Sequence, residues 1–96
     1  MVHRKALTLK QLRALAAIAD TGSVTAAAGM LHVTPPAVSS QLRTLEEIIG
    51  AQALERGPDG RVRLTPVGRE LLATVRKIET ALAGFPCKIR AWPSPL

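Results

Sequence analysis

Residues 23–50 read SVTAAAGMLHVTPPAVSSQLRTLEEIIG, and this stretch decides the fold. Ser23 is a typical helix N-cap, and the alanine-rich residues 24–31 after it predict a short helix. Residues 32 and 33 leave room only for a brief turn, because a second helix start follows at once. The stretch therefore predicts two short helices joined by a tight turn, which is the pattern of a helix-turn-helix.

The second helix of this pair has clear start and stop signals. Thr34 is an N-cap candidate, and Pro35 occupies the first helical position, where a missing N–H costs nothing. Gly50 predicts the end of the helix. We expect the apolar residues to face the core, because they recur at helical steps. They are Val38, Leu42, Leu45 and Ile49.

The first two turns of this helix carry small and polar side chains. A helix that enters the major groove of DNA end-on needs a slim N-terminus with hydrogen-bonding groups. The candidate DNA contacts are therefore Thr34, Pro35, Pro36, Ser39, Ser40 and Arg43. Plainer interpretations remain open: the serines are ordinary exposed positions, and Arg43 pairs with Glu46 or Glu47 at helical spacing. Glu46 is expected to support the fold.

The flanking segments complete a small domain. Thr8 and Gln11 have the spacing of a capping box, which predicts a helix that ends at Gly22. Residues 54–56 and 61–64 are short extended segments around the turn sequence Gly-Pro-Asp-Gly, and they predict a two-stranded wing. The expected fold is mostly α: a winged helix-turn-helix with a three-helix core and a small wing, followed by a long dimerisation helix.

The last helix starts at Thr65-Pro66 and is expected to run to about residue 83. Its apolar residues follow the alternating three-and-four spacing of a coiled-coil seam, which predicts pairing of two copies. The predicted dimerisation residues are Leu71, Val75, Ile78 and Leu82, with Leu64 and Gly68 in the same register and Val67 and Leu72 turned toward the domain. The alternative is a helix that folds back on its own domain.

This reading divides the chain into three segments. Residues 1–65 form the DNA-binding domain, 66–83 the linker or dimerisation helix, and 84–96 an irregular tail with Cys87 as an inert thiol.

Composition favours a polyanionic partner. Thirteen Lys and Arg residues stand against seven Asp and Glu residues, so the formal net charge is +6. A basic surface that merely keeps the protein in solution is the alternative. The two aromatic residues, Phe85 and Trp92, do not suit a base-stacking surface for single strands.

Other function classes find little support in the sequence. One cysteine and two distant histidines give neither metal-ligand spacing nor a nucleophile and base pair, so we expect no enzyme and no cofactor. Charges recur along the whole chain, so we expect no membrane helix and a cytoplasmic protein.

Residues 8–83 resemble the N-terminal domain of LysR-type transcriptional regulators. The matching pieces are LRAL at 12–15, GSVTAAA at 22–28, LHVTPPAVSSQL at 31–42, LE at 45–46, ER at 55–56 and LTPVG at 64–68. The resemblance implies a homodimer that binds an interrupted palindrome in double-stranded DNA and regulates transcription. It also places Arg56 in the minor groove. Arg56 bonded to the wing backbone is the alternative, and Arg61 and Arg63 are expected to face phosphates or solvent.

The chain also departs from the family pattern. Ala53-Leu54 stands where Leu-Phe is usual, and Pro35 stands where a glutamine is common. The family's larger effector-binding domain is absent from these residues, so no small-molecule effector is expected. The rival function is a truncated, dimerising fragment that pairs with full-length regulators and interferes with them.

Overall fold

The computed structural model describes residues 6–84, which form four helices and one two-stranded antiparallel sheet. The mostly helical fold with a wing is confirmed, and the helix boundaries agree with those expected. The second strand begins one residue later than predicted, because Arg61 belongs to the turn. The elements are α1 (Leu9–Thr21), α2 (Val24–Leu31), α3 (Pro35–Ile49), β1 (Leu54–Arg56), β2 (Val62–Leu64) and α4 (Pro66–Ala83).

A hydroxyl side chain starts each of the four helices. Each accepts a hydrogen bond from a backbone N–H in the first turn, which has no partner within the helix. Thr8 also belongs to a complete capping box, since its own N–H donates to Gln11 Oε1 at 3.1 Å. The cap and donor pairs are Thr8 and Gln11 (3.2 Å), Ser23 and Ala26 (3.1 Å), Thr34 and Ala37 (3.3 Å), and Thr65 and Gly68 (3.0 Å).

The first three helices end in left-handed residues. Gly22 and Gly50 have φ values of 73° and 71°, and each donates its N–H to a carbonyl of the last turn. His32 ends α2 with φ 60° although it carries a side chain. A non-glycine residue in this region is strained, so the tight turn between α2 and α3 is held by its surroundings.

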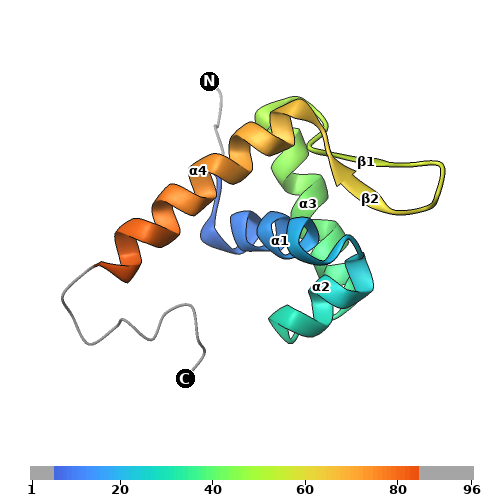
Figure 1. Cartoon of the computed structure of the whole chain (residues 1–96), viewed down its shortest axis with the longest axis horizontal. Helices are drawn as coiled ribbons and strands as arrows, with labels where there is room; N and C mark the ends of the chain where they lie inside the picture. The colour runs from blue at the N-terminus through green and yellow to red at the C-terminus, as the bar shows by residue number, and fades with distance from the viewer. Residues whose placement is uncertain (1–5, 85–96) are drawn as a thin grey trace.

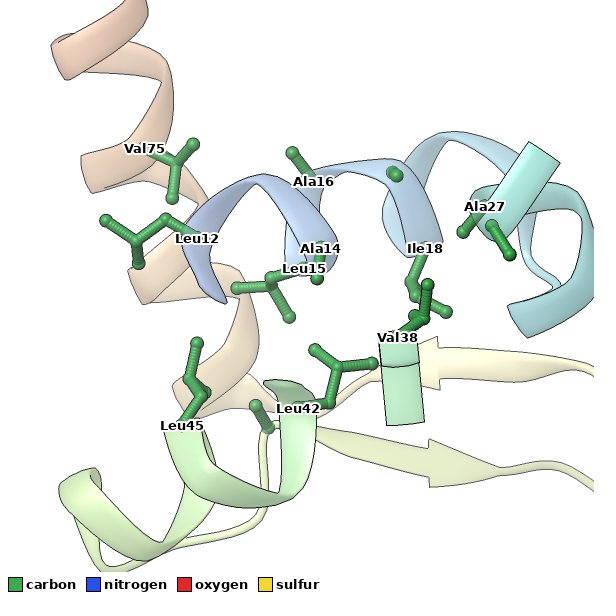
Figure 2. Close-up of a cluster of buried hydrophobic side chains, with 13 residues drawn as sticks. Leu12, Ala14, Leu15, Ala16, Ile18, Ala27, Val38, Leu42, Leu45 and Val75 are labelled. Carbon is green, nitrogen blue, oxygen red and sulfur yellow. The ribbon is translucent and has the colours of Figure 1, made fainter. Parts of the chain in front are cut away.

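The hydrophobic core lies where α1 crosses the other helices. Figure 1 shows α1 between α4 and the α2–α3 pair, with the wing to one side. In Figure 2, Leu12 of α1 lies beside Val75 of α4, while Leu15 points toward Leu42 and Leu45 of α3. The core positions expected on α3 are confirmed at Val38, Leu42 and Leu45, each at most 4% exposed, while Ile49 is half-buried. Leu12 and Leu15 of α1 complete this core at 7% and 0% exposed.

Helix α4 belongs to this core, which corrects part of the predicted dimer seam. Val75 is 2% exposed and packs within its own chain, so it is not available to a partner. Gly68 is also buried, and its Cα lies against the backbone of Ala53. Val67 is 40% exposed instead of turned toward the domain. A stripe of apolar residues marks a buried face, but its spacing does not say which helix covers it.

The tail predicted beyond residue 84, with Cys87, lies outside the described residues. Within residues 6–84, every helix is too short or too polar to cross a lipid bilayer.

Candidate DNA interface

The N-terminal turns of α3 form an open polar surface. Thr34, Pro35 and Pro36 are exposed, and so are Ser40 and Arg43 one and two turns further on. The stripe that includes Val38 and Leu42 is buried against α1 and α2, so the opposite face of α3 points outward. The first turn of α3 offers an anion few backbone donors, because Pro35 and Pro36 have no N–H and Ala37 donates its own to Thr34.

A groove of about 300 Å³ separates α3 from the wing. Ser39 is half-buried and lines this groove with Arg43, while Arg56 lines it from β1. The structure thus brings together the candidate residues of the two elements, which are 13 positions or more apart in sequence. Glu55 also lines the groove, and the sequence analysis did not single it out.

Arg43 and Glu46 have different roles on α3. Arg43 is exposed and makes no ion pair with Glu46 or Glu47 in the described part of the chain, so the pairing alternative is not observed. Glu46 accepts hydrogen bonds from the N–H groups of Ala53 and Leu54 at 2.9 and 3.2 Å. The carboxylate therefore ties the root of the wing to α3, and the expected structural role of Glu46 is observed.

Arg56 bonds to the wing itself. Its Nη1 donates to the carbonyl oxygen of Gly60 at 2.9 Å, so the alternative of a backbone contact describes this structure. The side chain nevertheless stays exposed beside the groove. This bond fixes one edge of the guanidinium at the wing tip.

The wing tip also holds an ion pair. Asp59 accepts from the N–H of Arg61 at 3.1 Å and from Nη2 of Arg63 at 3.1 Å. The backbone bond from Arg61 lowers the pKa of Asp59, and the charge of Arg63 lowers it further. Asp59 is therefore ionised at neutral pH and offsets the charge of Arg63, which is less available to phosphates than expected.

Two arginines meet the carboxyl end of α1, and sequence reasoning missed both contacts. Arg76 of α4 donates to Asp20 at 2.9 Å, and this bond raises the pKa of Arg76. Arg61 lies over Gly22, with Nη2 3.1 Å from the position that a Cβ would take there. Both pairs join residues at least 39 positions apart, so no local pattern could reveal them.

The described residues do not bring together three His, Cys, Asp or Glu side chains that could share a metal ion. The surface chemistry is that of exposed hydroxyls and arginines, which suits a phosphodiester backbone and base edges.

Comparison with known proteins agrees with this geometry. Residues 9–69 match the model of the bacterial regulatory helix-turn-helix protein, lysR family. The regulator CbbR of Cereibacter sphaeroides is 45% identical over 84 residues, and the small neutral protease regulatory protein of Streptomyces coelicolor is 47% identical over 75 residues. These alignments cover 86% and 78% of this chain, but the chain spans only 27% and 23% of the length of these relatives.

Solved structures show the same fold with DNA. The DNA-binding domain of CbnR in complex with DNA is 38% identical, with a TM-score of 0.70 over 80% of this chain and 86% of that one. The BenM domain bound to a benA site is 35% identical, with a TM-score of 0.72 over 78% and 83%. The family model covers more than half of the chain. The chain therefore belongs to the LysR family of bacterial transcriptional regulators, and its residues 9–69 match the helix-turn-helix DNA-binding domain of that family.

Proposed function

We propose that this chain binds double-stranded DNA sequence-specifically as a homodimer and regulates transcription in the bacterial cytoplasm. In this proposal α3 enters the major groove and the wing follows the adjacent minor groove. The observation that carries it is the exposed N-terminal face of α3, which stands beside the wing across one groove. DNA binding is supported further by the relatives of the same fold that were solved in complex with DNA.

The side chains on α3 have distinct parts in this proposal. Ser39 and Ser40 are short enough to let the helix approach base edges, and their hydroxyls donate or accept hydrogen bonds. Arg43 is exposed and has no acidic partner within residues 6–84, so its guanidinium is available to a phosphate or a guanine. The side chains of Thr34, Pro35 and Pro36 are small, so they let the N-terminal end of α3 come close to the DNA backbone.

Arg56 is proposed as the minor-groove contact of the wing. Its bond to Gly60 leaves further N–H donors on the same guanidinium, because an arginine has five. A cation at this place is favoured most where the minor groove is narrow and rich in A·T pairs.

Pairing of two copies is proposed through the outer face of α4. Leu71 and Ile78 are only half-buried by the domain, and Leu82 does not belong to the core of its own chain. Val67, on the same side of the helix, is exposed. Val75 lies beneath this surface, so it is left out of the proposed contact. The contact then consists of Val67, Leu71, Ile78 and Leu82.

The DNA-binding proposal is tested by selection from a pool of random duplexes, followed by affinity measurements at several salt concentrations. The slope of log K against log salt is expected to be about −0.9 for each phosphate neutralised. Arg43→Ala should weaken binding and reduce the magnitude of this slope by about 0.9, the contribution of one phosphate. Lys77→Ala, an equal loss of charge on exposed α4, is the matched control. A flat salt dependence, or equal effects of the two variants, would contradict the proposed face.

The dimer proposal has a separate test. Leu82→Asp should give a monomer in sedimentation, while Thr80→Asp, on an exposed position of the same turn, should leave the dimer intact. Equal association of the two variants would remove α4 from the interface. The rival function, a truncated fragment that pairs with full-length regulators and interferes with them, uses the same surface of α4. It predicts weak DNA binding by the chain alone and strong pairing with a longer regulator.

A further inference from the structure

The free edge of the wing is tied to the end of α1. Gly57 and Arg61 are joined by a backbone bond, and Ala53 and Thr65 by another, on either side of the paired strands. Hydrogen-bonded pairs alternate along an antiparallel ladder, so the N–H of Val62 points away from β1. This N–H donates to the carbonyl oxygen of Gly22 at 3.4 Å. The outer edge of β2 thus has a partner outside the sheet.

The acceptor residue has no side chain, and the neighbouring arginine uses that space. Gly22 adopts φ 73°, which turns the chain from α1 toward α2. A Cβ built on Gly22 would lie 3.1 Å from Nη2 and 3.8 Å from Cζ of Arg61. The guanidinium therefore lies directly over the backbone of Gly22, and any side chain at this position would have to displace it.

The charge at this end of α1 favours the contact. The last turn of α1 has no basic residue, although the C-terminal end of a helix attracts cations. Asp20 adds a negative charge, which Arg76 pairs from α4. Arg61 supplies a second cation from the wing; its side chain stays exposed but lies against the end of α1.

The wing is held in its direction at two points along the hairpin. Two sets of bonds hold it: the root is fixed by Glu46 on β1, and the middle is fixed by Gly22 on β2. A hairpin held only at its root can swing, whereas one held at a second point on its edge cannot. Figure 1 shows the wing extending beyond the helices from this region.

We propose that Gly22 is a positioning residue that fixes the direction of the wing relative to α3. Its carbonyl holds the N–H of Val62, and its bare Cα admits Arg61. This inference rests on the proposed DNA binding, because the direction of the wing decides whether the wing reaches the DNA that flanks the major-groove site.

A matched pair of variants tests the proposal in the full chain. Gly22→Asn and Gly50→Asn both place a side chain on a left-handed helix end, with φ 73° and 71°, and asparagine tolerates this conformation. Only position 22 meets a neighbour, since nothing lies within 4 Å of a Cβ at position 50. Backbone strain is therefore the same in both, and contact with Arg61 is the difference.

DNA affinity is measured on two duplexes. One is the duplex selected from the random pool, and the other is shortened to remove the outer base pairs that a hydroxyl-radical footprint assigns to the wing. Gly22→Asn should weaken binding to the long duplex about tenfold, which is the loss of one good contact. It should match the wild-type chain on the short duplex. Gly50→Asn should change neither affinity by more than about twofold.

Amide hydrogen exchange of Val62 provides a readout without DNA. Exchange should become about tenfold faster in Gly22→Asn and stay unchanged in Gly50→Asn, because only the first displaces Arg61, the residue next to the bonded N–H of Val62. Equal losses of affinity in the two variants would overturn the proposal. So would a loss that persists on the short duplex, or an unchanged Val62 amide. Failure of the wild-type chain to bind any duplex would refute the proposed function, while the Val62 amide still decides whether Gly22 holds the wing.

Discussion

Replacing Gly68 with alanine is expected to separate α4 from the root of the wing. A Cβ on Gly68 would overlap the carbonyl oxygen of Ala53 and lie 3.0 Å from its carbonyl carbon. The obstacle is backbone, not the end of a flexible side chain, so the helix itself has to move. The same carbonyl accepts the N–H of Thr65 at 3.0 Å, and this bond would be strained as α4 shifts.

The magnitude follows from three contributions. Overpacking typically costs about 1–3 kcal/mol, and the strained backbone hydrogen bond adds about 1 kcal/mol. The higher helix propensity of alanine returns about 1 kcal/mol. We expect Gly68→Ala to lower the free energy of unfolding by about 1–3 kcal/mol, because the last two contributions cancel. For a domain of this size, that corresponds to a fall in Tm of roughly 5–20 °C.

Gly29 provides the matched control, because it is also a helical glycine. Nothing lies within 4 Å of a Cβ at this position, so Gly29→Ala should gain the helix propensity alone. We expect an increase of about 1 kcal/mol in the free energy of unfolding. Both variants are compared by thermal and urea unfolding followed by circular dichroism, at several protein concentrations because dimerisation stabilises the folded state. A Gly68→Ala chain as stable as the wild type would refute the reasoning.

Three further substitutions test other parts of the structure. Glu46→Ala leaves two backbone N–H groups at the root of the wing without their acceptor and should cost about 2–3 kcal/mol in urea unfolding, whereas exposed Glu47→Ala should stay within about 0.5 kcal/mol. Val75→Asp should unfold the domain, because the charge enters the core, while Ala73→Asp on the exposed side of α4 should keep the native circular dichroism spectrum; a folded Val75→Asp monomer would restore the original seam. His32→Asn should raise the free energy of unfolding by up to about 1 kcal/mol, since asparagine adopts φ 60° more readily, and a lower Tm would show that the imidazole makes a stabilising contact.

The sequence predicts the elements of this fold well because their signals are local. A hydroxyl cap, a proline in the first turn and a glycine after the last turn mark most of the helix ends, and each acts within four residues of the boundary. The Gly-Pro-Asp-Gly turn at 57–60 marks the wing in the same way. The buried stripe of α3 also follows from spacing alone, as Val38 and Leu42 show.

What the sequence could not predict is which distant groups meet. The spacing on α4 fits a seam between copies and a core contact equally well, and Val75 belongs to the second. Arg56 and Arg61 belong to the same hairpin, and nothing in the local sequence tells their partners apart. Arg56 nevertheless binds Gly60, whereas Arg61 lies over Gly22. Such contacts depend on how the elements pack in space. The sequence offers each arginine many carbonyl and carboxylate acceptors and does not show which one it meets.

The packing of α4 fixes the rotation of this helix about its own axis relative to the rest of the domain. Gly68 against Ala53 and Val75 in the core prevent rotation of the helix about its own axis. Each residue of an α-helix turns the chain by about 100° and advances it 1.5 Å. One residue inserted after Val75 would therefore turn the last turns of α4 by more than a quarter of a revolution while α3 stayed in place. The direction of any surface near Leu82 is therefore fixed relative to α3. Only an insertion of about seven residues, which is two helical turns, would return that surface to nearly the same direction.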